Sequence, residues 1–291
     1  MRRTIYPDTR IWNKLFEENV DPSHLALSLQ RRGWELALSP HVMYELARSF
    51  RAKRASSQKK AVPLFSYLER FLEHPVAFVK QTPDLLREEI RVANRELPKI
   101  DPYYREVQRE RMVQEIRSLA AGKLDPRFDA LFEYRSSQVA TYRAGAPERA
   151  AKWESWMKKN PDFSRDELTE MAFRQFRPQM MEAHISSVFE LPPKHVRRLA
   201  RKILSGPRFR FCHALVRGDI YLDWLQSQGR AIQRDVLDDC YHIENAAHCD
   251  VYATDESRQE PAANAILSVT DVRIHDKKEP LLKWLTTRAI Q

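Results

Sequence analysis

The chain has 291 residues and a net charge of +9. Hydrophobic residues make up 43% of it and charged residues 31%, which favours a globular, helix-rich protein over a disordered or fibrous one. No stretch approaches the roughly 18 consecutive apolar residues that predict a membrane span, so we expect no membrane partner and a cytoplasmic location. The cysteines form no CxxC pair, and we expect them to be reduced and buried.

The start of the chain carries alternating strand and helix patterns. Residues 4–8 form a short apolar run that ends on an acid, and residues 34–38 alternate in the manner of a second strand. Pro22 and Pro40 each follow a side chain that caps helices well, which places a helix start at both points. The resulting order of strand, helix, helix, strand and helix predicts a wound α/β domain with a parallel sheet.

Between residues 56 and 228 the helix signals follow one another with almost no strand candidates. We therefore expect a discontinuous α/β core, formed by residues 1–55 and 229–291, which a large all-helical insertion over residues 56–228 interrupts. This insertion would hold the substrate or dock a partner. In the last part of the chain we expect helices from residue 235, over residues 262–267 and from residue 280, and strands over residues 251–254 and 268–274.

The first of these late helices and the strand after it concentrate acids. Asp235 is a natural N-cap for the helix, and Asp238 completes a capping-box-like pair with it. Asp239 and His242 lie one turn apart on a polar stripe of the same helix. Asp255 follows the strand, at the edge of a parallel sheet where ligand sites lie.

Four carboxylates from distant parts of the chain follow strand ends or stand in adjoining helices. They are Asp8, Glu45, Asp239 and Asp255, with Asp238 as an alternative to Asp239. Carboxylates that converge at one edge of a sheet would raise each other's pKa unless a cation neutralises them, and Mg²⁺ or Mn²⁺ suits oxygen ligands. The sequence therefore predicts a divalent cation site, although Asp8 taken alone would more simply be a helix cap.

This spacing resembles the PIN-domain family of metal-dependent nucleases. The resemblance extends over about residues 1–55 and 229–275, and the segments that carry it are 6–12, 38–46, 238–242 and 249–255. It implies a PIN-like three-layer αβα core with a central parallel sheet. It also implies that the four acids bind one or two Mg²⁺ or Mn²⁺ ions. The implied reaction is hydrolysis of a phosphodiester bond by a metal-activated water.

The expected function is that of an endoribonuclease, with RNA favoured over DNA by the resemblance alone. His242 would contact the scissile phosphate or orient a ligand, or would make only structural hydrogen bonds. A toxin or antiphage effector would suit a stand-alone nuclease. The alternatives are a DNA endonuclease that uses the same acids and a non-catalytic RNA-binding or assembly subunit. No Gly-rich phosphate loop, zinc-ligand spacing or nucleophile elbow occurs, which disfavours nucleotide switches, zinc enzymes and α/β-hydrolases.

Basic segments with interspersed aromatic residues lie within the predicted insertion. Their apolar positions recur at helical spacing and are most simply core residues, which would leave the cations as a solvated face. The functional interpretation is that the cations contact the phosphates of a nucleic acid. An inhibitory or scaffold protein is the other partner that the insertion would suit. The candidate phosphate-binding residues are Arg174, Arg177, Arg197, Arg198, Arg201 and Lys202.

Overall fold

The computed structural model describes residues 2–228, 232–275 and 285, with the side chains of residues 165 and 166 excepted. The protein belongs to the predicted α/β class: it is 69% helical, with a small parallel sheet of five strands. Within the described residues the strands are β1 (Arg3–Pro7), β2 (Trp34–Leu38), β3 (Val76–Phe78), β4 (Val251–Ala253) and β5 (Arg273–Ile274). The helices are α1 (Thr9–Glu17), α2 (Pro22–Arg31), α3 (Pro40–Ala47), α4 (Ala55–Phe71), α5 (Thr82–Ala93), α6 (Glu106–Ala120), α7 (Arg127–Ala144), α8 (Ala146–Lys159), α9 (Arg165–Val188), α10 (Pro193–Ser205), α11 (Arg210–Ser227), α12 (Arg234–Asn245) and α13 (Gln259–Leu267), with short 3-10 helices η1 (Arg48–Arg51) and η2 (Ala246–His248).

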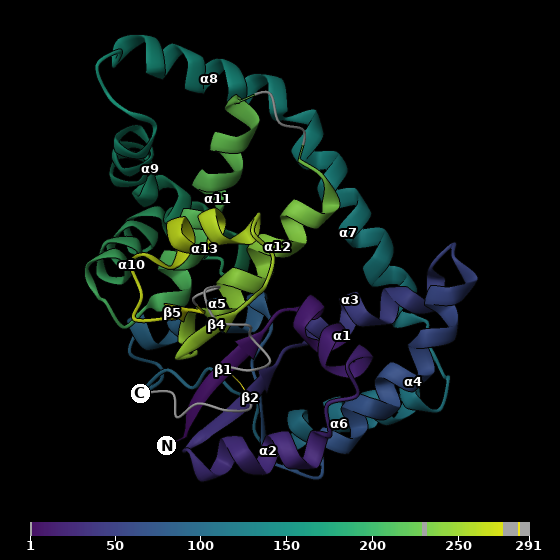
Figure 1. The fold of residues 1–291 in the computed structure, drawn as a ribbon. Helices are drawn as coiled ribbons and strands as arrows, with labels where there is room; N and C mark the ends of the chain where they lie inside the picture. Colours follow the sequence, from purple (N-terminus) through teal and green to yellow (C-terminus); the bar gives the residue numbers. More distant parts are fainter. Residues whose placement is uncertain (1, 229–231, 276–284, 286–291) are drawn as a thin grey trace.

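The sheet has the strand order β3-β2-β1-β4-β5, and all neighbouring strands run parallel (Figure 1). Ile5 of the central strand β1 pairs with Leu36 of β2 on one side and with Val251 of β4 on the other. The chain first builds outward from β1 to β3 and later returns to the opposite side of β1 as β4. The strand order therefore reverses between β1 and β4, and at such a switch point the carboxyl ends of the strands leave room for a ligand.

Local capping interactions explain why the first helices begin where the sequence predicts. Asp8, Asp21 and Ser39 each accept a hydrogen bond from the backbone N–H three residues further on. Pro22 and Pro40 stand at the start of their helices, where a missing N–H removes no hydrogen bond. The predicted order of strand, helix, helix, strand and helix is confirmed.

The prediction that residues 56–228 are all helical is wrong at one point. Strand β3 lies within this segment and pairs in parallel with β2, with Ala77 beside Ala37, at an edge of the sheet. A strand of three residues is too short to show a pattern of its own, so only its pairing in the folded sheet identifies it. Buried residues from both predicted parts form one hydrophobic core, which also contains the three free cysteines. The division into a core and an insertion stays a prediction.

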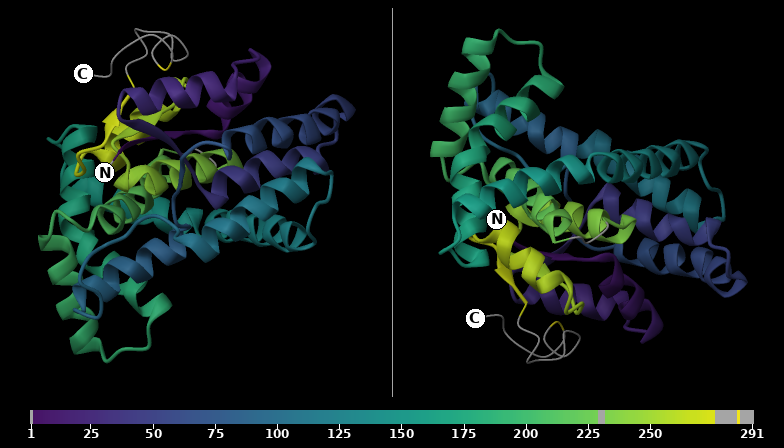
Figure 2. Two further views of the ribbon diagram at one scale, coloured as in Figure 1. Left: turned by 90° about the horizontal axis from the view of Figure 1, so that it is seen from below. Right: turned by 90° about the horizontal axis from the view of Figure 1, so that it is seen from above.

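Long helices from the middle of the chain extend away from the sheet. Figure 1 shows α7, α8, α9 and α11 above the sheet, with α8 at the top. In both views of Figure 2 the purple N-terminal helices lie on one side of the sheet, and the teal and green helices lie on the other. Trp153 of α8 packs edge-on against Trp224 of α11, with ring centroids 5.0 Å apart. No helix in the described part of the chain is long and apolar enough to cross a membrane.

The elements predicted for the last part of the chain are confirmed in part. Helix α12, strand β4, helix α13 and strand β5 follow one another in the predicted order. Asp235 does not cap α12, because the helix begins one residue earlier and its N-cap is Gln233, without a side-chain capping bond. The strand expected over residues 268–274 is confined to its last part, β5. The helix expected from residue 280 lies outside the described residues.

Replacement of Phe78 by Ala tests the placement of β3. Phe78 is 1% exposed and belongs to the core, so its truncation removes buried apolar surface and leaves a cavity. We expect the free energy of unfolding to fall by about 3–5 kcal/mol. Phe163 is 44% exposed and serves as the matched control, since Phe163→Ala should change this free energy by less than about 0.5 kcal/mol. Urea denaturation measures both, and similar losses in the two variants would contradict the packed position of β3.

Candidate functional site

A cavity of about 230 Å³ lies beside the switch point between β1 and β4. Asp8 and Thr9 reach it from the end of β1, and Glu256 reaches it from the segment after β4. Glu45 of α3 and His242 of α12 line it from two adjoining helices. The other lining residues are Arg10, Asn13, Asp235, Asp239, Arg258 and Gln259. Segments that are far apart in the sequence thus meet around one cavity.

Asp8 is both a helix cap and a buried acid. Its Oδ1 accepts a 2.8 Å hydrogen bond from the backbone N–H of Ile11, and its Oδ2 is buried without a hydrogen-bond partner. Burial raises the pKa of Asp8 to about 6, although the hydrogen bonds from the Thr254 side chain and from Ile11 and the charge of His242 act in the opposite direction. An ionised carboxylate at this depth is costly, and a cation close to it would offset part of that cost.

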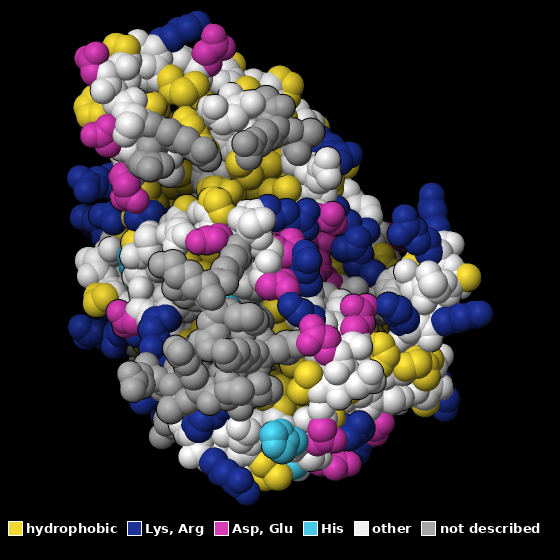
Figure 3. All heavy atoms as spheres, viewed as in Figure 1, with side chains coloured by type: hydrophobic (Ala, Val, Ile, Leu, Met, Phe, Trp, Pro, Cys, Tyr) yellow, Lys and Arg dark blue, Asp and Glu magenta, His cyan; other side chains and the backbone are white. Residues whose placement is uncertain are grey.

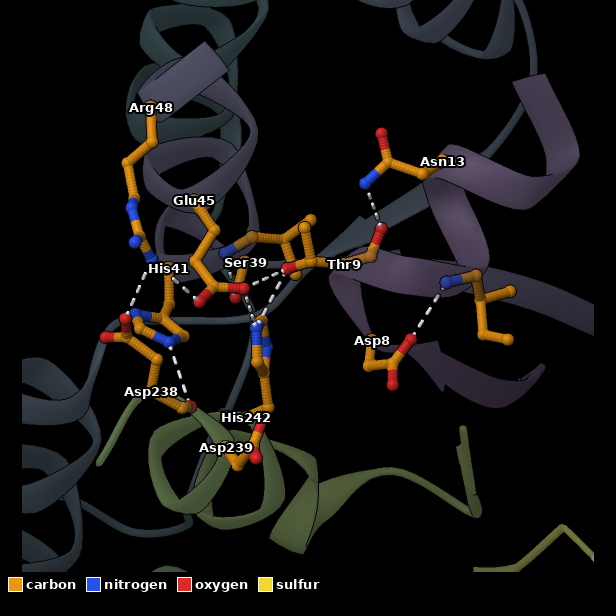
Figure 4. A network of polar contacts seen from close by, with 12 residues as sticks. Asp8, Thr9, Asn13, Ser39, His41, Glu45, Arg48, Asp238, Asp239 and His242 are labelled. Carbon is orange, nitrogen blue, oxygen red and sulfur yellow. Dashed lines mark hydrogen bonds and ion pairs between the residues drawn. The ribbon is translucent and has the colours of Figure 1, made fainter. Parts of the chain in front are cut away.

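Glu45, Thr9 and His242 form a hydrogen-bonded cluster (Figure 4). Nε2 of His242 lies 2.7 Å from Oε2 of Glu45 and 2.9 Å from Oγ1 of Thr9. The hydroxyl of Thr9 donates to the same oxygen of Glu45. On the other side of the ring, Nδ1 of His242 lies 3.3 Å from the hydroxyl of Tyr6. The imidazole is therefore held at both nitrogens, with Nε2 directed at Glu45.

Charges within this cluster keep Glu45 ionised. Burial raises the pKa of Glu45, but the charge of His242 and its hydrogen bond outweigh burial and hold the pKa below its usual value. Burial lowers the pKa of His242, but the charge of Glu45 outweighs it, so that the pKa of His242 is raised. At His41, burial and the neighbouring His242 hold the pKa well below its usual range. The cluster thus favours an ionised Glu45, a protonated His242 and a neutral His41.

One ligand atom each of His41, Glu45 and His242 lies within 4.8 Å of the other two, which brings a metal ion within reach of all three. Both nitrogens of His41 already have partners. Nε2 lies 3.1 Å from the backbone oxygen of Asp238, and Nδ1 lies 3.4 Å from a guanidinium nitrogen of Arg135. A metal on these three residues would have to displace one of these contacts as well as the hydrogen bond between Glu45 and His242.

Of the two neighbouring acids on α12, Asp239 and not Asp238 lines the cavity. Oδ1 of Asp239 accepts a 2.7 Å hydrogen bond from Gln259, and burial raises the pKa of Asp239 to about 7. Oδ2 of Asp238 instead lies 3.1 Å from Arg48 and 3.8 Å from Arg234. Figure 4 shows the two acids leaving α12 in different directions, as consecutive helical residues do at about 100° per residue.

Asp255 does not line the cavity, contrary to the prediction. Its carboxylate pairs with Arg10 and Lys14 of α1, with a distance of 3.1 Å to each. Glu256 lines the cavity in its place. The chain turns after β4, where the hydroxyl of Thr254 accepts a hydrogen bond from the backbone N–H of Glu256. The pattern of a strand end located the acidic segment, but the turn decided which of two adjacent acids reaches the cavity.

Several residues at the site were not predicted from the sequence. Thr9 directly follows Asp8, and Glu256 directly follows Asp255. The residue after each strand-end acid was therefore also a candidate for the site. His41 precedes Glu45 by four residues on α3, and this spacing places two side chains on one helix face. Arg258 carried no sequence signal, because only the fold brings it to the cavity wall.

The acids around the cavity fit a hydrated divalent cation. Among the described residues, no three carboxylates have ligand atoms that all lie within 4.8 Å of one another. Mg²⁺ keeps several of its waters and takes only one or two carboxylates directly. Acids that surround a cavity of about 230 Å³ without converging on one point suit such an ion, and the unpartnered Oδ2 of Asp8 offers it a ligand atom.

The raised pKa of Asp239 predicts a pH-dependent stability in the absence of divalent cations. An acid with a folded-state pKa of about 7 and an ordinary value of 3.8 binds its proton more tightly in the folded state. The stability gained in this way is fully present below the unfolded pKa and is lost as the pH rises through about 7. Between about pH 4 and about pH 7 we expect Asp239→Asn to lose less stability than the parent protein. Urea denaturation with EDTA checks this, and parallel losses would show that Asp239 does not titrate there.

The six basic residues predicted to contact nucleic acid all lie outside the cavity. Arg174 and Arg177 stand on α9, and Arg177 lies over the ring of Phe173 at 5.5 Å from its centroid. The other four stand on α10: Arg197, Arg198, Arg201 and Lys202. The cations that line the cavity itself are instead Arg10 and Arg258.

The cavity thus gathers acidic side chains, a buried histidine and two arginines. Carboxylates beside guanidinium groups can hold a divalent cation and an anionic group next to it. Comparison of the chain with models of protein families, with curated proteins and with solved structures gave no match. The function is therefore inferred from the arrangement of these side chains.

Proposed function

We propose that the protein is a metal-dependent nuclease with a PIN-like three-layer core, and that RNA is its substrate. The observation that carries this proposal is the gathering of Asp8, Glu45 and Asp239 around one cavity at the switch point of a parallel sheet. The segments that resemble PIN-domain nucleases supply all three acids. Arg10 and Arg258 on the wall of the same cavity carry charges that complement a phosphodiester.

Asp8, Glu45 and Asp239 are the residues that would hold one or two divalent cations, with Glu256 in place of Asp255. When bound, such an ion lowers the pKa of a coordinated water and offsets the negative charge of the phosphate. Burial raises the pKa of Asp8 to about 6 and that of Asp239 to about 7. A cation close to these carboxylates would lower both pKa values and favour the ionised forms.

The neighbouring side chains orient Glu45 and receive the phosphate. His242 and Thr9 both reach Oε2 of Glu45, so that the carboxylate is held ionised and in one orientation. The guanidinium groups of Arg10 and Arg258 both contact Glu256. Each exposes more than half of its side chain, at 58% and 57%, which leaves donors for the phosphate oxygens of a substrate.

A cleavage assay tests the proposal and its alternatives. Purified protein is incubated with labelled RNA and DNA of the same sequence, with Mg²⁺, Mn²⁺, Zn²⁺ or EDTA. We expect internal cleavage of RNA with Mg²⁺ or Mn²⁺ and none with EDTA. Cleavage of DNA with RNA left intact would favour the DNA endonuclease, and cleavage with Zn²⁺ alone would favour the group of His41, Glu45 and His242 as the metal site. Binding without product under all conditions would contradict the enzyme and favour a non-catalytic RNA-binding subunit.

The cellular role of such an enzyme would be that of a cytoplasmic toxin or antiphage effector, kept in check by an inhibitory protein. Unrestrained RNA cleavage stops growth, so expression of the parent protein in bacterial cells should reduce colony formation. Expression of Asp8→Asn at the same level should not. Equal colony numbers for the parent, the variant and an empty vector would contradict a toxin role.

A further inference from the structure

Helix α10 carries a dense group of exposed cations on one face. Its other face is apolar and buried: Val196, Leu199 and Ile203 are each less than 5% exposed. The exposed face carries Lys194, Arg197, Arg198 and Arg201. The helix is therefore anchored in the core by its apolar side, and its charged side faces solvent.

Cations from two other segments extend this face. Lys202 donates a hydrogen bond to the backbone oxygen of Ala93, which joins α10 to the end of α5. Arg95 follows α5 and Arg208 precedes α11, and both side chains are exposed. Desolvation and the charges of Arg95, Arg208 and Arg198 lower the pKa of Lys202, so each of these arginines lies close enough to act on the charge of Lys202. We define the basic surface by six residues: Arg95, Arg197, Arg198, Arg201, Lys202 and Arg208.

The basic surface lacks counter-charges of its own. Within the described part of the chain, none of its six cations forms an ion pair with a carboxylate, although nearby Arg91 pairs with Glu96 and Arg210 pairs with Asp271. Figure 3 shows Lys and Arg side chains gathered at the edge of the molecule where Figure 1 places α9 and α10. Cations that a fold holds together without a paired carboxylate favour an external anion that neutralises several of them at once.

We propose that the basic surface binds the phosphate backbone of a nucleic acid at a second site, separate from the cavity. No residue of the basic surface lines the cavity. An anionic membrane is the less suitable partner, because the apolar face of α10 is buried and cannot enter a bilayer. None of the exposed large hydrophobic residues lies on α10 or in the segments around Arg95 and Arg208, so we expect the contacts of the basic surface to be to phosphates rather than to stacked bases. Binding at this site does not depend on the proposed nuclease activity.

The combined variant Arg197→Gln, Arg198→Gln and Arg201→Gln tests this site without altering a buried residue. Binding of fluorescent RNA and DNA duplexes of the same sequence is followed by anisotropy in EDTA, between about 50 and about 200 mM KCl. We expect the parent to bind both duplexes with steep salt dependence. In the variant, affinity at about 50 mM KCl should fall about tenfold or more, and the slope of log affinity against log salt should be less steep by about 0.9 for each phosphate that the variant no longer neutralises.

The matched control removes three charges from a different helix. Lys152→Gln, Lys158→Gln and Lys159→Gln lie on α8, where two of the lysines pair with glutamates, and should leave affinity and slope close to those of the parent. Equal losses in both combined variants would overturn the proposal, because net charge alone would then explain binding. Binding to phosphatidylserine vesicles but not to nucleic acid would overturn it as well. EDTA prevents metal-dependent cleavage, so the binding assay reports on the basic surface alone. Absence of binding by the parent protein in this assay would contradict the second site, whereas absence of cleavage with Mg²⁺ or Mn²⁺ would contradict the nuclease proposal.

Discussion

Asp8→Asn is expected to remove metal-dependent cleavage while leaving the fold intact. Mutation of a residue that only forms a hydrogen bond to a metal ligand typically lowers activity or metal affinity by about 10–100-fold. Replacement of a charged ligand itself should therefore lower the cleavage rate by more than about 100-fold. Asn caps helices as well as Asp does, and its side-chain oxygen can still accept the hydrogen bond from Ile11. The variant also buries a neutral group where the parent buries an acid. Single-turnover cleavage with Mn²⁺, together with thermal unfolding, measures both effects.

Asp21→Asn provides the matched control for this variant. Asp21 caps α2 as Asp8 caps α1, and its Oδ1 accepts a 2.7 Å hydrogen bond from the backbone N–H of His24. Its carboxylate is exposed, paired with Arg70 and absent from the cavity lining. We expect full cleavage from Asp21→Asn. Should Asp8→Asn cleave at the parent rate, Asp8 would be only a cap and the metal site would lie elsewhere.

Glu45→Gln is the second change expected to abolish cleavage, again by more than about 100-fold. The amide keeps groups that can form hydrogen bonds with Thr9 and His242 but carries no charge for a cation. Because the charge of Glu45 is what raises the pKa of His242 against the effect of burial, this pKa should fall in the variant. An NMR titration of the His242 imidazole without metal measures the shift independently of activity. An unchanged pKa would contradict the ion pair, and unchanged cleavage would contradict the role of Glu45.

Glu89→Gln is the control, because the buried Glu89 pairs with His248 outside the cavity. Oε1 of Glu89 lies 2.6 Å from Nε2 of His248, and the carboxylate also accepts hydrogen bonds from the backbone N–H groups of Phe211 and Cys212. Its replacement should lower the free energy of unfolding by about 1–3 kcal/mol, since buried hydrogen bonds to a charged group are weakened. Cleavage by the folded protein and the pKa of His242 should not change. Loss of cleavage in folded Glu89→Gln would place the chemistry outside the cavity.

The parts of the fold that were predicted correctly depend on neighbours in sequence. Asp8, Asp21 and Ser39 each cap the helix that they precede, and a cap acts across three residues. The same reasoning failed at Asp235, where α12 begins at the residue before it and no side-chain cap forms. Strand β3 was missed because three residues carry too little pattern, and its identity comes from pairing with β2.

The candidate site was predicted in outline and corrected in detail. Asp8 and Glu45 line the cavity, but among the described residues no three carboxylates have ligand atoms within 4.8 Å of one another, so their convergence on one cation stays a prediction. The choice between Asp238 and Asp239 depended on the rotation of α12, and Glu256 replaced Asp255 because of the turn after β4. Both corrections concern the direction of a side chain. A sequence pattern predicts which helix or strand carries a residue. It predicts less well whether the side chain of that residue points toward residues from distant parts of the chain.

By itself, the sequence determined the α/β class, the starts of the first helices and the four acidic segments, because caps, strand runs and helix periodicity act over a few residues. The tertiary structure alone decided that Glu45 and His242 form a hydrogen-bonded pair, that Arg258 reaches the cavity and that Lys202 donates a hydrogen bond to the backbone oxygen of Ala93. Each of these contacts joins elements that are far apart in the chain. Their geometry follows from the parallel sheet and the packed core, which bring the segments together only when the whole protein folds.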